Sequence, residues 1–144
     1  MPYIAIWIHA VWATKNRERI ITNEIKPKLL AHIKENAKSK EIYINEMNCE
    51  PEHLHALISL SADQSISEVM QLIKGESSYW INKNKLTKVK FGWQDEYFAV
   101  SVSKSQIGSV KKYIRNQEEH HLRKSYTEEC EEFISKYGFD KYKI

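Results

Sequence analysis

The chain has 144 residues, of which 42% are hydrophobic and 28% are charged, as is usual for a soluble globular protein. This length suffices to bury one core, so we expect a single domain over residues 1–144. Two cysteines are too few for a disulfide framework, and no segment resembles a signal peptide or a membrane span, so we expect a cytoplasmic protein with no membrane partner. The net charge is only +3, so the total charge does not establish nucleic-acid binding.

The first half of the chain mixes strand-like and helix-like patterns. Residues 3–13 are apolar, aromatic or β-branched, which predicts a long strand. Residues 22–38 carry apolar side chains at helical spacing, which predicts a helix with Pro27 near its start, where the missing N–H is harmless. We expect strands over residues 41–49 and 53–60, and the short turn between them predicts an antiparallel hairpin.

The second half predicts three helices and one strand. Ser65 and Glu68 form a capping-box pattern that opens the first of these helices. A strand follows over residues 97–102, then an amphipathic helix over 106–124 and a last helix over 127–137. The order β-α-β-β-α-β-α predicts the α+β class, with a ferredoxin-like antiparallel sheet and helices on one of its faces.

Two histidines separated by one leucine stand at the start of the strand predicted over residues 53–60. Side chains on a strand alternate between its faces, so His53 and His55 leave the same face and can hold one cation. The alternative is two imidazoles on a half-exposed sheet face without a metal, and the triplet alone leaves both open. For His9, on the first strand, we expect a core or sheet-face histidine with a satisfied hydrogen bond.

The helix predicted over residues 106–124 brings a phenol and a carboxamide together. Tyr113 and Gln117 are four residues apart, so they lie on one helical face. Basic residues surround this pair, and a second basic group follows the first predicted strand. Local positive potential suits phosphate contacts, although a solvated charged surface has the same composition. The two groups are Lys111, Lys112 and Arg115, and Lys15, Arg17 and Arg19.

Five segments carry a recognisable combination of residues along nearly the whole chain. They are Ile8-His-Ala-Val-Trp-Ala-Thr-Lys-Asn-Arg17, Pro51-Glu-His-Leu-His-Ala-Leu-Ile58, Ile73-Lys-Gly-Glu-Ser-Ser-Tyr-Trp80, Trp93-Gln-Asp-Glu-Tyr-Phe98 and Tyr113-Ile-Arg-Asn-Gln-Glu-Glu-His-His121. A strand with His-hydrophobic-His, followed by a helix with one tyrosine and a glutamine four residues later, resembles the HUH single-tyrosine transposases. Within that family the chain is most similar to the REP-associated and IS200-like members.

The resemblance implies a metal-dependent enzyme that cleaves and rejoins single-stranded DNA at hairpin-flanked sites through a 5′-phosphotyrosine link. It implies that Tyr113 is the nucleophile and that His53, His55 and Gln117 bind Mg²⁺ or Mn²⁺. No nucleotide cofactor is expected, because the phosphotyrosine link retains the energy of the broken phosphodiester. The resemblance further implies a homodimer whose partner subunit supplies the tyrosine helix.

The resemblance also suggests roles for residues around the predicted nucleophile and metal ligands. The candidate DNA-binding residues are Lys15, Asn16, Arg17, Lys111, Lys112 and Arg115, and the candidate extra metal ligands are His120 and His121. Glu52 stands where aspartate is common, and Ala56 where a larger aliphatic residue is usual, but neither change removes a ligand or the nucleophile. Two other functions remain open: a non-catalytic nucleic-acid-binding module on the same fold, and a metal-dependent phosphodiesterase that uses water.

Overall fold

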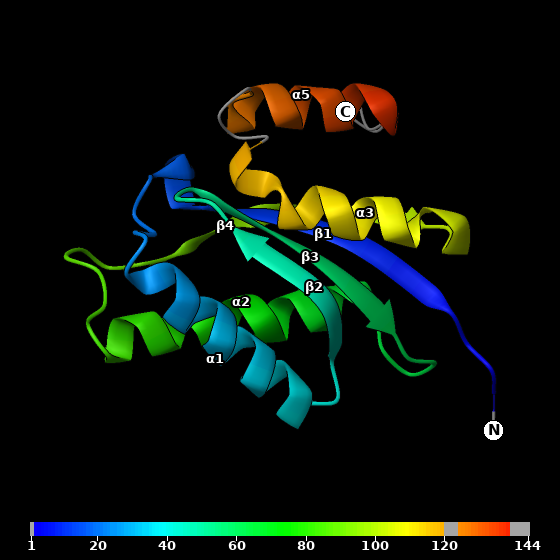
Figure 1. Ribbon diagram of the computed structural model, residues 1–144. Coiled ribbons are helices and arrows are strands. Elements are labelled where there is room, and N and C mark those ends of the chain that lie inside the picture. Colours follow the sequence, from blue (N-terminus) through cyan, green and yellow to red (C-terminus); the bar gives the residue numbers. More distant parts are fainter. Residues whose placement is uncertain (1, 120–123, 139–144) are drawn as a thin grey trace.

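The structure is a computed structural model that describes residues 2–119 and 124–138 (Figure 1). Its four-stranded sheet has the order β2-β3-β1-β4, and every neighbouring pair is antiparallel. The strands are β1 (Ile6–Thr14), β2 (Tyr43–Cys49), β3 (His53–Leu60) and β4 (Trp93–Val102). The predicted α+β class and the predicted antiparallel sheet are therefore confirmed, including the β2-β3 hairpin.

Helices lie on both faces of this sheet (Figure 1). Helices α1 (Ile25–Ser39) and α2 (Ile66–Lys83) cover one face, as in the predicted ferredoxin-like arrangement. Ser65 caps α2 as predicted, because its side chain accepts a hydrogen bond from the Glu68 N–H. Helices α3 (Ile107–Arg115) and α5 (Tyr126–Lys136) are added on the opposite face.

Strand β3 separates the core from the candidate site. Leu54, Ala56 and Ile58 point to the main hydrophobic core, and all three are fully buried there. His53 and His55 alternate with them, so they point to the face that α3 and α5 cover. A smaller apolar cluster on that face joins β1 to α5 and consists of Val11, Ala13, Tyr126, Cys130 and Phe133.

Most elements lie within three residues of their predicted bounds, and two, β4 and α3, differ by more. Strand β4 begins at Trp93, four residues before the predicted start, because Trp93 pairs with Thr14 of β1 beyond an irregularity in the register. The sequence pattern did not predict this part of the strand, because residues 94–96 are the polar run Gln94-Asp-Glu96. Helix α3 ends at Arg115 with Asn116 as its C-cap, so Gln117 follows the helix that carries Tyr113.

Residues 120–123 of the helix predicted over residues 106–124 lie outside the part of the chain that the structure describes. Within residues 2–119 and 124–138, no helix combines the length and the apolar character needed to cross a bilayer.

Candidate active site

Strand β3 and helix α5 bring three potential metal ligands together on the sheet face below α3. One ligand atom from each of His53, His55 and Glu129 lies within 4.8 Å of the others, and all three residues are buried. The distance from His53 Nε2 to Glu129 Oε2 is 3.4 Å, and that from His55 Nε2 to Glu129 Oε1 is 3.2 Å. Gln117 adds a fourth donor, because its Oε1 lies 3.4 Å from His53 Nε2. The predicted ligands His53, His55 and Gln117 are therefore brought together.

The far side of each imidazole has a partner of its own. His53 Nδ1 lies 2.8 Å from Glu52 Oε1, and the second oxygen of Glu52 accepts a hydrogen bond from Arg19 at 3.1 Å. His55 Nδ1 lies 2.9 Å from His9 Nε2. His9 is thus buried and hydrogen-bonded, as expected, but its partner is one of the predicted metal ligands. These contacts turn the Nε2 atoms of both predicted ligand histidines toward Glu129.

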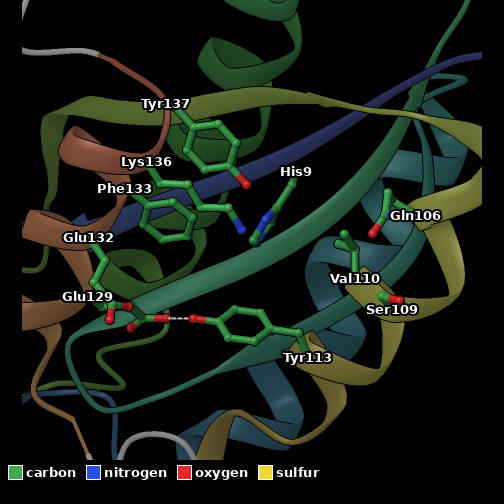
Figure 2. A pocket seen from close by; sticks show the side chains of 10 residues that line it. All are labelled: His9, Gln106, Ser109, Val110, Tyr113, Glu129, Glu132, Phe133, Lys136 and Tyr137. Atoms are coloured by element: carbon green, nitrogen blue, oxygen red, sulfur yellow. Dashed lines mark hydrogen bonds between the residues drawn. The ribbon is translucent and has the colours of Figure 1, made fainter.

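Tyr113 reaches this cluster from α3. Its hydroxyl donates a hydrogen bond to Glu129 Oε1, and its ring lies edge-on to His55 with 5.6 Å between the ring centroids. Figure 2 shows Tyr113 and Glu129 pointing at each other from the two helices. The predicted nucleophile and the predicted metal ligands therefore meet within a single chain.

Burial and charge pairing shift the pKa values of these groups in opposite directions. Burial tends to lower the pKa of His53, but hydrogen bonds and charge attraction from Glu129 and Glu52 outweigh it and raise this pKa to about 9. Burial tends to raise the pKa of Glu129, but its hydrogen bonds with His53 and His55 bring it below its ordinary value. In the metal-free protein at neutral pH, Glu129 is therefore ionised and His53 is protonated.

Tyr113, the predicted nucleophile, and His9 are both neutral under the same conditions. Burial is the main reason that the pKa of Tyr113 is well above its usual range, and the hydrogen bond to Glu129 raises this pKa further. The phenol therefore keeps its proton. Burial and the neighbouring His55 lower the pKa of His9 to about 3.

A hollow of about 280 Å³ opens beside Tyr113 between α3 and α5 (Figure 2). Phe133 and Tyr137 supply aromatic walls from α5 and the residue after it, and their rings stack at a centroid distance of 5.8 Å. Gln106 and Ser109 add polar groups from the α3 side. The hollow therefore offers both a stacking surface and hydrogen-bonding groups next to Tyr113.

Of the predicted basic residues that follow β1, Arg17 contacts α5. Lys15, Asn16 and Arg17 form a short 3-10 turn in which Asn16 and Arg17 have left-handed φ values of 59° and 55°. The Arg17 guanidinium donates a hydrogen bond to Thr127 Oγ1 at 3.1 Å and lies over the Tyr126 ring. This turn therefore stands beside the helix that carries Glu129.

The basic residues of α3 are distributed around that helix. Lys112 and Arg115 are exposed, whereas Lys111 is half-buried. The Arg115 guanidinium pairs with Glu46 of β2 at 3.1 Å, so part of its charge is already neutralised. His120 and His121 lie outside the described residues.

Glu129 is the principal residue that the sequence analysis missed. It stands in the acidic run Glu128-Glu-Cys-Glu-Glu132, where no local signal distinguishes one carboxylate from another. Only its neighbours Tyr126, Cys130 and Phe133, which pack on β1, decide which carboxylate faces the histidines. A prediction that the last helix covers the His53 and His55 face would have been needed to find it.

The donor set fits a divalent cation. Two imidazole nitrogens, one carboxylate and one carboxamide oxygen converge in a buried place. A mixed nitrogen and oxygen set of this kind suits Mn²⁺ and is compatible with Mg²⁺.

The sequence model of the family described as "Transposase IS200 like" matches residues 3–117 of the chain. The chain belongs to the IS200-like transposase family. As an IS200-like transposase, the protein is an enzyme of DNA transposition. The match includes β1, β3 with its two histidines, and Tyr113. It ends before α5, the helix that supplies Glu129.

Individual transposases agree with this membership. The chain is 25% identical over 114 residues to the ISDra2 transposase TnpA of Deinococcus radiodurans, which covers 76% of this chain and 81% of the relative. It is 25% identical over 115 residues to the transposase for insertion sequence element IS200 of Salmonella typhimurium, with 76% and 74% covered.

Two solved structures share the fold of this IS200-like transposase. One is the crystal structure of a transposase candidate from Deinococcus radiodurans, with a TM-score of 0.64 at 20% identity, covering 81% of this chain and 93% of that one. The other is a REP-associated tyrosine transposase bound to a REP hairpin, with a TM-score of 0.61 at 20% identity, covering 84% and 72%.

Proposed function

We propose that this IS200-like transposase cleaves and rejoins single-stranded DNA through a covalent link to Tyr113, in a single HUH domain that spans residues 1–144. One observation carries the proposal: the Tyr113 hydroxyl and the Nε2 atoms of His53 and His55 all approach the Glu129 carboxylate. A nucleophile and a cation site next to each other are what phosphoryl transfer to a side chain requires.

The proposed ligands of the cation are His53 and His55 through nitrogen, and Glu129 and Gln117 through oxygen. Mg²⁺ or Mn²⁺ is the proposed cation, and when bound it would act as a Lewis acid on the scissile phosphate. His53 must give up its Nε2 proton before this nitrogen can coordinate a metal, so we expect proton release on binding.

In the proposed reaction, the Tyr113 oxygen forms a bond to phosphorus while the bond from phosphorus to the 3′ oxygen breaks. The phenol loses its proton as it attacks, and the leaving 3′ oxygen takes up one proton to become a hydroxyl. The product is a 5′-phosphotyrosine ester. Attack by a 3′-hydroxyl on that ester reverses the step and releases Tyr113, so rejoining requires no nucleotide cofactor.

We propose that the DNA carries hairpins beside the cleavage site, as the REP-associated relative is bound to a REP hairpin. The hollow between α3 and α5 would receive an unpaired nucleotide, because bases stack on aromatic side chains such as Tyr137. The backbone would lie along basic residues on either side of Tyr113. Those residues are Lys15, Asn16, Arg17, Lys111, Lys112 and Arg115. We propose that the reaction takes place in the cytoplasm.

Covalent capture tests this function. Labelled single-stranded hairpin DNA is incubated with the protein and Mn²⁺ or Mg²⁺, and the products are separated on a denaturing gel. We expect a protein-sized adduct that Tyr113→Phe abolishes and that Tyr79→Phe, at an exposed tyrosine of α2, leaves unchanged. Cleavage that survives Tyr113→Phe would instead indicate attack by water. Binding without cleavage would indicate a non-catalytic module.

We further propose a homodimer in which each chain uses its own tyrosine, since Tyr113 contacts the histidine cluster of the same chain. Light scattering measures the oligomeric state directly. A mixture of the Tyr113→Phe and His55→Ala proteins tests which chain supplies the tyrosine. In a mixed dimer, an intact Tyr113 and an intact His55 can meet only if the tyrosine comes from the partner subunit. We expect no recovery of the covalent adduct, whereas recovery would show that the partner subunit supplies the tyrosine helix.

A further inference from the structure

His9 lies on the strand next to the proposed metal ligands and on the same sheet face. In the β1-β3 register, His9 is opposite Leu57 and Val11 is opposite His55, so His9 and His55 form a diagonal cross-strand pair. Aromatic side chains on such diagonals are within reach of each other. The two rings are stacked with 5.1 Å between their centroids, and His9 Nε2 lies 2.9 Å from His55 Nδ1.

Coordination through one imidazole nitrogen fixes the chemistry of the other nitrogen. His55 Nε2 faces the Glu129 carboxylate, so it is the nitrogen available to a cation. A neutral imidazole that coordinates through Nε2 must carry its proton on Nδ1, and this proton needs an acceptor in a buried place. The atom 2.9 Å from His55 Nδ1 is His9 Nε2. To accept that proton, His9 must itself be neutral with its hydrogen on Nδ1.

We propose that His9 is a positioning residue that holds His55 in the tautomer able to bind metal through Nε2. The inference rests on the proposed function, because it concerns the same cation. Glu52 has the equivalent relationship to His53, since its carboxylate accepts from His53 Nδ1 at 2.8 Å. The two ligands therefore have unlike supports: an anionic carboxylate behind His53 and a neutral imidazole behind His55.

Packing alone does not explain why position 9 is a histidine, because another aromatic ring could make the same contacts. The His9 ring also contacts Tyr113 and Phe133 edge-on, at centroid distances of 6.0 and 5.7 Å. A phenylalanine at this position would keep these ring contacts and lose only the acceptor. A glutamine would lose the ring but retain an acceptor oxygen at a similar distance from the backbone.

This pair of variants separates acceptor chemistry from packing. Mn²⁺ binding to wild type, His9→Phe and His9→Gln is measured by calorimetry in the absence of DNA, with thermal unfolding in chelator as the folding control. We expect His9→Phe to weaken Mn²⁺ binding about 10- to 100-fold, the usual effect of losing the partner of a ligating histidine. We expect His9→Gln to recover most of this loss. Equal affinity in wild type and His9→Phe would overturn the inference, and so would equal losses in both variants.

Nuclear magnetic resonance provides a second readout that does not depend on affinity. In the Zn²⁺-loaded wild type, long-range ¹H-¹⁵N correlations report which ring nitrogens carry protons. We expect protons on Nδ1 of both His55 and His9, and a proton on His9 Nε2 would overturn the inference. Failure of the wild type to bind either Mn²⁺ or Zn²⁺ would refute the proposed metal site, and this inference with it. Binding by wild type that His9→Phe leaves unchanged would refute the role of His9 alone.

Discussion

The Tyr113 hydroxyl and the Glu129 carboxylate, sixteen residues apart and on different helices, share a hydrogen bond above the sheet. The accepting oxygen, Glu129 Oε1, is also the one that lies 3.2 Å from His55 Nε2. One carboxylate therefore contacts both the proposed nucleophile and a proposed metal ligand. This contact makes α5, which lies beyond the part of the chain matched by the family, a component of the site.

Removing the charge of Glu129 is expected to weaken metal binding. Glu129→Gln keeps the size of the side chain but replaces an anionic ligand with a neutral one, and the affinity of a cation depends on the charge of its ligands. We expect the Mn²⁺ dissociation constant to rise about tenfold or more, as measured by calorimetry. Glu131→Gln, at an exposed position of the same helix, is the matched control. Equal affinities in these two variants would exclude Glu129 from the ligand set.

The stability of the metal-free protein is expected to fall as the pH rises from about 6.5 to 9. Folding raises the pKa of His53 from 6.5 to about 9, so its contribution is fully present below pH 6.5 and is lost as the pH passes through 9. The difference between these two pKa values corresponds to roughly 3 kcal/mol. Urea unfolding in chelator at several pH values measures the change.

Glu52→Gln serves as the comparison for this pH dependence. It replaces one of the two carboxylates that raise the pKa of His53, so the loss of stability should be smaller and should occur at lower pH. An identical pH profile in wild type and Glu52→Gln would contradict this assignment.

Leu54 tests whether the two faces of β3 act independently. This residue stands between the two proposed ligands but points into the main core, where it is fully buried. Leu54→Ala should lower the free energy of unfolding by about 2 to 5 kcal/mol through loss of buried surface and formation of a cavity. Well below the unfolding temperature, Mn²⁺ affinity should remain within about twofold of wild type. A large loss of affinity in the folded variant would mean that the core side of β3 positions the histidines.

Lys111 and Lys112 are expected to contribute to DNA affinity through phosphate contacts. Each contact with single-stranded DNA changes the slope of log affinity against log salt by about 0.7. The double variant Lys111→Gln with Lys112→Gln should therefore reduce the magnitude of this slope by about 1.4, as measured by fluorescence anisotropy with hairpin DNA. Lys34→Gln with Lys38→Gln, on α1 at the opposite sheet face, should leave the slope unchanged. Equal slopes for the two double variants would remove Lys111 and Lys112 from the interface.

Local patterns were sufficient for most of the fold. The bounds of β3 are those predicted from its apolar run, and Ser65 caps α2 as its spacing with Glu68 indicates. Patterns failed where tertiary pairing overrides local preference. The polar start of β4 is held by its pairing with β1, and the helix of Tyr113 ends at Arg115 although no proline or glycine marks that end.

The sequence by itself determined that His53 and His55 share a face, because the side chains of a strand alternate whatever surrounds the strand. It also predicted that Tyr113 and Gln117 share one helical face; the helix ends at Arg115, but Gln117 Nε2 still lies 3.5 Å from the Tyr113 carbonyl. Only the tertiary structure decided what lies opposite these groups: Glu129 from α5, and His9 on the diagonal of the neighbouring strand. Their positions depend on strand register and on the packing of a distant helix, which are set by contacts between residues far apart in the chain.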